Sequence, residues 1–279
     1  MLPAQASLAT LANQPDAAID LAAAALAISR LFQPEVTTDR WLEELDDLAA
    51  AARNRIRGEA ELLGQVAMLN EFLFAERGFS GNRDDFYDPR NSFLDQVLAR
   101  RLGIPITLSV VYVEVAARIG LPACGVGFPA HFLVRVGHGS SALMLDTYAG
   151  GVALPEAELD RRLADVFGEG QLSIRSNPSL LRPAGKHEIL VRMLRNLVSV
   201  YRLRGDQANL LEALNAVLTL APDLPDELRQ RGLLYAALGY HPAALSDLQR
   251  FSEVADNAEE IAAIAPIIAD LSQRPLKLH

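Results

Sequence analysis

Hydrophobic residues in the first eighty positions recur every three to four residues, which is the period of a helix with one buried face. Three such stretches are predicted to be helices, at about 18–32, 38–56 and 59–77. Pro34 ends the first stretch and Thr38 can cap the second. The segment 78–91 is rich in Gly, Asn, Asp and Pro, so we expect a loop there.

Two shorter helices are predicted next. Ser92 and Asp95 have capping-box spacing and open a helix that ends near Gly103. The pair Ile104-Pro105 introduces a further helix over roughly 107–119.

The period then changes from helix to strand. The runs ACGVGFP, HFLVRVG and ALMLDTY are short, rich in strand-forming residues and separated by turn residues. They predict an antiparallel sheet of about three strands. The order of helices, strands and helices indicates a helix-rich α+β domain over residues 1–180, with a turn-rich linker at 173–186.

The last hundred residues are helical and repeat with a period of 34. Tyr201 and Gly205 recur as Tyr235 and Gly239. At the same shift Leu211 recurs as Leu245, Leu214 as Leu248, and Leu220 as Val254. This pattern resembles the tetratricopeptide repeat, a helix–turn–helix unit. We therefore expect an all-α domain at 187–279 with two units and a terminal helix, a plain helical hairpin bundle being the alternative.

Composition and charge narrow the function classes. With 26 Lys and Arg against 35 Asp and Glu, the net charge is −9, which disfavours binding to nucleic acid or an anionic membrane. One cysteine, Cys124, excludes an internal disulfide and a multi-cysteine zinc site. The sequence has no metal-ligand spacing and no nucleotide-binding motif, and we expect no targeting segment. We expect a cytoplasmic protein without metal or cofactor.

The most informative stretch runs from about 91 to 151. It holds the turn RIGLPA, a strand that begins His131-Phe132-Leu133-Val134, and a strand that ends Asp146-Thr147. These motifs resemble the core of the transglutaminase-like (papain-like) superfamily. The phrase NSFLDQVLARRLGIPITLS at 91–109, with helices before the core and repeats after it, resembles the bacterial SirB-type family.

The resemblance implies a Cys–His–Asp site with the nucleophilic Cys at a helix N-terminus. His131 and Asp146 hold the His and Asp positions, and we expect them within hydrogen-bonding reach on adjacent strands, beside the N-terminus of the 107–119 helix. The family's Cys precedes the turn glycine, here Gly120, by about fifteen residues. That count reaches Pro105 or Ile106, and neither carries a nucleophile.

Four other polar residues are candidates for the pocket. Thr107 and Ser109 could act as substitute nucleophiles, or they could cap the helix and pack in its first turn. Cys124 could approach His131, or it could be a small buried hydrophobe in a strand. Asn91 could cap the next helix or face the pocket.

Two functions remain open for the chain. The first is a non-catalytic protein that binds a peptide or protein partner through a core without its nucleophile and through the repeats. The second is an amide-processing enzyme, such as a protease, transglutaminase or amidase, with an unorthodox nucleophile. His131 and Asp146 are then either an inherited structural hydrogen bond or part of a pocket that still binds a ligand.

Overall fold

A computed structural model of the chain describes residues 3–273. The described residues form two compact units. The larger unit is Gln14–Met193, and the smaller combines the described parts of Met1–Asn13 and Leu194–His279.

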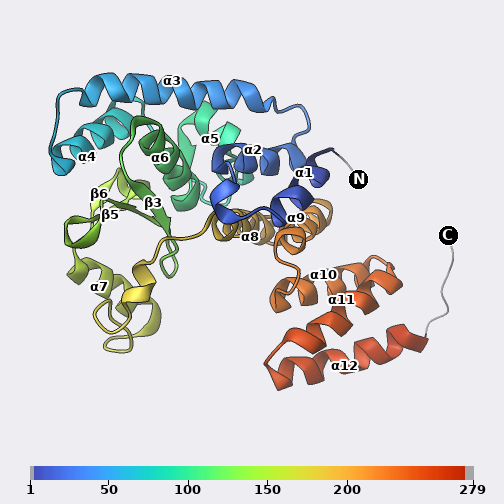
Figure 1. The fold of residues 1–279 in the computed structure, drawn as a ribbon. Helices are drawn as coiled ribbons and strands as arrows, with labels where there is room; N and C mark the ends of the chain where they lie inside the picture. Colours follow the sequence, from blue (N-terminus) through green and yellow to red (C-terminus); the bar gives the residue numbers. More distant parts are fainter. Residues whose placement is uncertain (1–2, 274–279) are drawn as a thin grey trace. The chain divides into compact units, whose positions relative to one another are not determined.

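The larger unit contains six complete helices and two small sheets among its described residues (Figure 1). Its helices are α2 (Leu21–Phe32), α3 (Thr38–Ile56), α4 (Leu62–Asn70), α5 (Leu94–Arg100), α6 (Pro105–Ile119) and α7 (Glu156–Phe167). Its strands are β1 (Ser80–Gly81), β2 (Leu102–Gly103), β3 (Ala123–Val126), β4 (Leu133–Val136), β5 (Leu143–Asp146) and β6 (Val152–Ala153).

The predicted N-terminal helices are present, with one interruption. The helix expected over 59–77 is α4 followed by a π-helical turn, Glu71–Glu76. In this turn the Arg77 amide donates to the Phe72 oxygen, five residues back, at 2.9 Å. One wide turn of this kind inside a helical run carries an extra residue without breaking the chain's direction.

The main sheet is antiparallel in the order β3-β4-β5-β6, and helices cover both of its faces. Val134 lies opposite Leu145 in the register, and both are fully buried on the face that α6 covers. Residues that point the other way, including Leu133 and Met144, pack with α7 in one hydrophobic cluster. In Figure 1, α6 and α7 accordingly lie on opposite sides of the strands. The three expected strands are confirmed, and β6 is a short fourth strand that the sequence did not predict.

Three local predictions are wrong. Thr38 is the first residue of α3 rather than its cap, since Thr37 precedes the helix and no side chain caps it. Ser92 does not cap α5, because it lies in a 3₁₀ turn, Pro89–Ser92, and Phe93 precedes the helix with no side-chain cap. The next helix begins at Pro105 rather than at 107, since proline suits the first helical position, where no amide hydrogen is needed.

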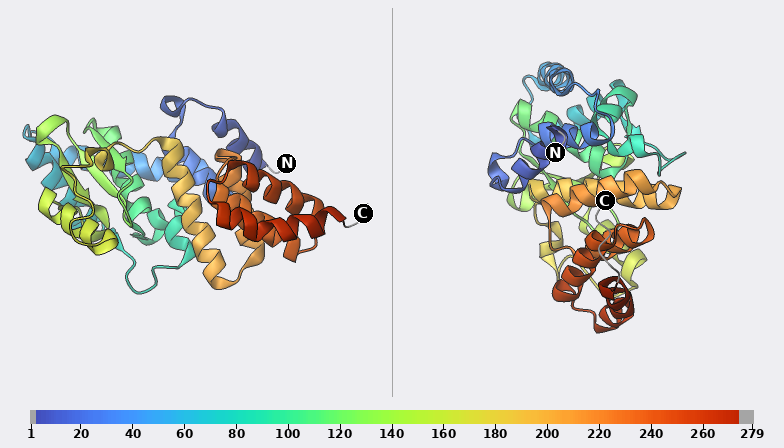
Figure 2. Two further views of the ribbon diagram at one scale, coloured as in Figure 1. Left: turned by 90° about the horizontal axis from the view of Figure 1, so that it is seen from below. Right: turned by 90° about the vertical axis from the view of Figure 1, so that its right-hand side faces the viewer.

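The smaller unit is all-helical. It contains α1 (Pro3–Ala12), the second half of α8 (Lys186–Arg204), α9 (Gln207–Leu220), α10 (Pro225–Ala237), α11 (His241–Val254) and α12 (Ala258–Gln273). Successive helices from α9 to α12 contact one another, and α1 packs against α9 (Figure 2).

The 34-residue period is visible in the backbone. Gly205 and Gly239 both have positive φ, +67° and +82°, in the turns after α8 and α10. Leu220 and Val254, also 34 apart, are the last residues of α9 and α11. Equivalent positions therefore have equivalent conformations, as a repeat requires.

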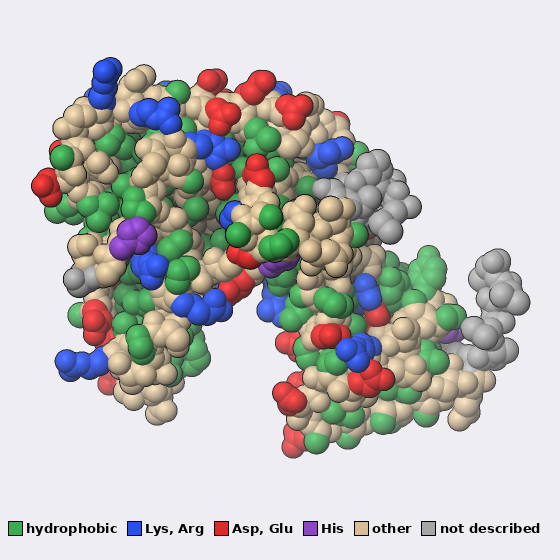
Figure 3. Space-filling view, viewed as in Figure 1, with side chains coloured by type: hydrophobic (Ala, Val, Ile, Leu, Met, Phe, Trp, Pro, Cys, Tyr) green, Lys and Arg blue, Asp and Glu red, His purple; other side chains and the backbone are tan. Residues whose placement is uncertain are grey.

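The two units divide inside α8, between Met193 and Leu194. The segment expected as a linker, 173–186, belongs to the larger unit, where Ile174 is buried in the cluster under α7. No helix within residues 3–273 is long and apolar enough to cross a membrane. On the face shown in Figure 3, acidic and basic side chains are interspersed.

Candidate functional site

His131 and Asp146 form a hydrogen-bonded pair at one edge of the main sheet. His131 Nε2 lies 2.9 Å from Asp146 Oδ1. His131 precedes β4 by two residues and Asp146 is the last residue of β5, so the antiparallel pairing of these strands brings the two side chains together. The carboxylate is buried, with 4% of its side chain exposed, whereas 18% of the His131 side chain is exposed.

The Asp146 carboxylate is held in its ionised form from three directions. Besides His131, it accepts from Arg162 of α7 at 2.9 Å and from the amides of Tyr148 and Ala149 at 3.0 and 3.2 Å. Burial raises the pKa of Asp146, but the hydrogen bonds and charges of His131 and Arg162 outweigh burial and bring the pKa to about 2.

The backbone around His131 is held in an unusual conformation. Ala130 has φ +54°, a left-handed value that costs a residue with a Cβ about 1 kcal/mol or more. Arg192 of α8 donates to the main-chain oxygens of Phe128 and His131, at 3.2 and 2.5 Å. Its guanidinium carbon also lies 5.4 Å from the centroid of the Phe132 ring, within the range of a cation–π contact. These contacts fix where the His131 ring projects.

The N-terminus of α6 lies beside this pair. Thr147, which follows Asp146, donates weakly to the Pro105 oxygen at 3.4 Å. The two positions reached by counting back from Gly120 are Pro105 and Ile106; both are buried, and Ile106 is 1% exposed. The helix end is therefore present where the family places its nucleophile, and it carries apolar side chains there.

Thr107 and Ser109 are fully buried and their hydroxyls are engaged. Thr107 Oγ1 accepts from the Ile104 amide at 3.1 Å and donates to the Asn91 oxygen at 2.7 Å, which caps the first turn of α6. Ser109 Oγ lies 2.9 Å from Thr147 Oγ1. Both hydroxyls join α6 to neighbouring segments.

Asn91 holds the loop that precedes it. Its amide nitrogen donates to the oxygens of Asp85 and Phe86, at 2.8 and 3.2 Å, and its Oδ1 accepts from Asn82 at 3.0 Å. The side chain is fully buried and points toward this loop rather than capping α5.

Cys124 is not brought to His131. It is half-buried in β3, and its register partner in β4 is Arg135. Four residues separate Arg135 from His131, which corresponds to about 13 Å of extended chain. As a strand residue, Cys124 also lacks the helix N-terminus that would favour a thiolate.

A row of aromatic side chains extends from His131 to the loop at 82–88, which the sequence suggested as a border of the cleft; Tyr148, the link between them, was not singled out. The Tyr148 ring lies edge-on to the His131 ring, with centroids 6.4 Å apart, and edge-on to Phe86 at 6.1 Å. Tyr148 Oη donates to the Asn82 oxygen at 3.0 Å, and a Cβ on Gly81 would overlap the Tyr148 ring. Phe86 and Tyr87 are 41% and 50% exposed, so the far end of the row is open to solvent.

The sequence also gave no indication of Arg162 and Arg192. Arg162 contacts Asp146 from α7 and Arg192 contacts the His131 main chain from α8, and contacts between such distant segments leave no pattern in the sequence. Within residues 3–273, no three His, Cys, Asp or Glu side chains gather as metal ligands.

Comparison with known proteins assigns both parts of the chain. The family profile described as transglutaminase-like superfamily matches residues 39–195, and a tetratricopeptide repeat profile matches 197–269. The resemblances to the transglutaminase-like superfamily and to the tetratricopeptide repeat are thereby confirmed. The first profile spans the His131–Asp146 pair and the N-terminus of α6.

Full-length relatives are found in bacteria. A UPF0162 protein of Xylella fastidiosa is 36% identical over 283 residues, covering 100% of this chain and 98% of the relative. UPF0162 protein YchA of Escherichia coli is 27% identical over 239 residues, covering 85% and 87%. Human F-box only protein 21 is 34% identical over 201 residues, or 66% of this chain and 30% of the human protein. No solved structure matches.

Proposed function

We propose that this chain, which belongs to the UPF0162 family within the transglutaminase-like superfamily, binds a peptide segment of a partner protein and does not cleave it. The observation that carries the proposal is the buried Ile106 at the N-terminus of α6, beside a formed His131–Asp146 pair. A hydrocarbon side chain cannot attack a carbonyl carbon, so the covalent step of the superfamily lacks its first reactant.

The nearby substitutes do not restore that step. The Thr107 and Ser109 hydroxyls are fully buried and hydrogen-bonded within the fold. Cys124 is displaced along the sheet from His131. These contacts support structural roles for all three residues.

The remaining groups suit binding. A carboxylate only accepts hydrogen bonds, so Asp146 accepts from the hydrogen on His131 Nε2. The other ring nitrogen, Nδ1, forms no hydrogen bond to the described residues. This polar atom, with the aromatic row that runs through Tyr148 to the exposed Phe86 and Tyr87, matches a peptide backbone group followed by an aromatic or apolar side chain.

The C-terminal repeats support a protein partner independently. Helical repeats of this kind present extended surfaces for peptides or proteins. Leu233, Leu238 and Tyr240, all on or next to α10, are exposed apolar side chains that such a contact would cover. We propose the cytoplasm as the compartment, since one cysteine leaves no internal disulfide to maintain.

The test is a screen of a random peptide library against the full chain, read by affinity and by mass spectrometry of the recovered peptides. We expect intact peptides whose binding weakens in His131→Ala and Tyr148→Ala and is unchanged in Cys124→Ala. His138→Ala is the matched histidine control, because His138 is exposed in the turn after β4.

An amide-processing enzyme is the second candidate, favoured by the retained His131–Asp146 pair. It predicts cleaved or transamidated peptides, or rapid labelling of Cys124 by a vinyl sulfone that collapses in His131→Ala. We expect slow labelling that is indifferent to His131. The opposite result would replace the binding proposal with the enzyme.

A further inference from the structure

A second site lies at the opposite end of α6 from the His131–Asp146 pair. A cavity of about 220 Å³, open to solvent on one side, lies between the ends of α3 and α6 and the start of α4. It is lined by Arg53, Ile56, Arg57, Glu59, Gln65, Ile119, Gly120 and Leu121. We propose that it binds a compact apolar carboxylate, such as the C-terminal carboxylate of a chain that ends in a branched apolar residue.

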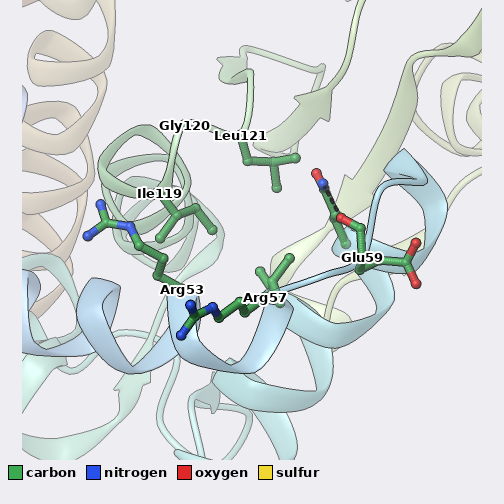
Figure 4. A pocket seen from close by; sticks show the side chains of 8 residues that line it. Arg53, Arg57, Glu59, Ile119, Gly120 and Leu121 are labelled. Carbon is green, nitrogen blue, oxygen red and sulfur yellow. Dashed lines mark hydrogen bonds between the residues drawn. The ribbon is translucent and has the colours of Figure 1, made fainter.

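The walls of the cavity define the apolar part of the ligand. Ile56, Ile119 and Leu121 contribute hydrocarbon from three segments, and Figure 4 shows the Ile119 and Leu121 side chains extending toward the space above Arg57. Sites for drug-sized ligands run to about 300–1,000 Å³, so a cavity of this size suits one side chain and its carboxylate rather than a larger molecule.

Arg57 supplies the charged contact. Its side chain is exposed and forms no ion pair or hydrogen bond with any residue in the described part of the chain. A guanidinium offers planar paired donors that match a carboxylate. Arg53 is less available, because it donates to the Arg118 oxygen at the end of α6.

The other polar groups do not oppose an anion. Helix C-termini normally repel negative charge, but here several of the terminal carbonyls already accept hydrogen bonds. The Arg118 oxygen accepts from Arg53, the Ala116 oxygen from the Leu121 amide at 2.9 Å, and the Ile56 oxygen from the Glu59 amide at 3.0 Å.

The single acid of the lining is turned away. Glu59 accepts from the Glu61 amide at 2.8 Å, and in Figure 4 its carboxylate lies on the side away from Arg53 and Arg57. Gln65 donates to the Glu59 main-chain oxygen at 2.8 Å, which fixes the wall next to it. The net charge of the lining is therefore positive, and the guanidinium of Arg57, which has no partner among the described residues, lies beside the apolar surface.

Titrations of the full chain with N-acetyl-leucine and with N-acetyl-leucine amide, followed by ligand-observed NMR, test the site. The two probes differ only in that a neutral carboxamide replaces the carboxylate, so we expect measurable binding of the acid and at least about fivefold weaker binding of the amide. Arg57→Gln should remove this preference without changing the affinity for the amide.

Arg55→Gln is the matched control. Arg55 lies two residues away on α3, pairs with Glu76 and does not line the cavity, so this variant should keep the preference. Equal affinities for acid and amide, no binding of either at millimolar concentration, or an equal effect of the two arginine variants would overturn the proposal.

A titration with a peptide distinguishes the two sources of such a carboxylate, a protein chain end and a free metabolite. A tetrapeptide acid ending in Leu binds at least as well as N-acetyl-leucine if the site takes chain ends, whereas only the small acid binds if the site takes free metabolites. Both results support the carboxylate site. Because the cavity is remote from His131, neither depends on the peptide-binding proposal.

Discussion

The guanidinium of Arg192 lies 2.5 Å from the main-chain oxygen of His131, and it also donates to the Phe128 oxygen three residues earlier. A side chain of α8 therefore fixes the turn that carries the exposed imidazole. Burial lowers the pKa of Arg192, partly offset by the charge of Glu188, which indicates a cation placed where two carbonyl oxygens must satisfy it.

Arg192→Ala should destabilise the larger unit by about 1–3 kcal/mol, because two carbonyl oxygens lose their donor. Urea unfolding gives the free energy, and hydrogen exchange should accelerate at the amides of 130–132. Arg182→Ala removes an exposed ion pair with Glu188 and should change stability by no more than about 0.5 kcal/mol. Equal effects of the two variants would contradict the assigned role.

Ala130→Gly should stabilise the fold, by about 0.5–1 kcal/mol. Glycine adopts φ +54° without the steric cost of a Cβ, and this gain exceeds the added freedom of the unfolded chain. Ala164→Gly, in the middle of α7, is the control with the opposite sign, at about 1 kcal/mol of destabilisation. Thermal unfolding distinguishes the two, and a loss of stability in Ala130→Gly would show that the strain is absent.

The free energy of unfolding should depend on pH through the ionisation of Asp146. Its pKa is about 2 in the folded protein against an ordinary value of 3.8, so the ionised form favours folding. This contribution, on the order of 2 kcal/mol, is complete above about pH 4 and is lost as the pH falls toward 2.

Asp146→Asn should therefore cost the most near neutral pH and progressively less below about pH 4, as measured by urea unfolding at each pH. Asp165→Asn, which changes an exposed carboxylate of α7, should leave the pH profile as it is. If the stability difference between the native protein and Asp146→Asn stays constant down to about pH 2, the lowered pKa is contradicted.

The repeat glycines should respond alike to substitution. Gly205→Ala and Gly239→Ala should each cost about 1 kcal/mol in the smaller unit, because a Cβ there meets no atom within 4 Å and only the positive φ opposes it. Gly232→Ala should cost more, since its Cβ would lie 2.8 Å from Leu248 carbons. Thermal unfolding measures all three, and unequal costs at 205 and 239 would argue against equivalent repeats.

Much of the helical architecture is predictable because its determinants are local. α3 covers the periodic stretch predicted for it, and α6 starts two residues before its predicted start, at the proline that precedes it. The repeat can be recognised in the sequence because Gly205 and Gly239 occupy equivalent turns, where a positive φ favours glycine. α7 was not predicted, although Pro155 precedes it and Leu159 and Leu163 follow at helical spacing.

The parts that could not be predicted depend on contacts between distant segments. Ser92 has the right spacing for a cap, but Asn91 next to it binds the loop at 82–86 and the 3₁₀ turn prevails. In the site, family resemblance placed His131 and Asp146, whereas Arg162 and Arg192 reach them only through the packing of α7 and α8. Periodicity describes which face of a helix is buried, not which of its arginines meets a distant carbonyl.

The pairing of α1 with α9 has a consequence for synthesis of the chain. α1 ends at Ala12, whereas its partner α9 begins only at Gln207, so α1 is synthesised long before α9. At about 5–20 residues per second, the first helix waits roughly 10–40 s for its partner. During that interval the segment Gln14–Met193 can fold as a unit, and α1 joins the smaller unit only after α9 has been made.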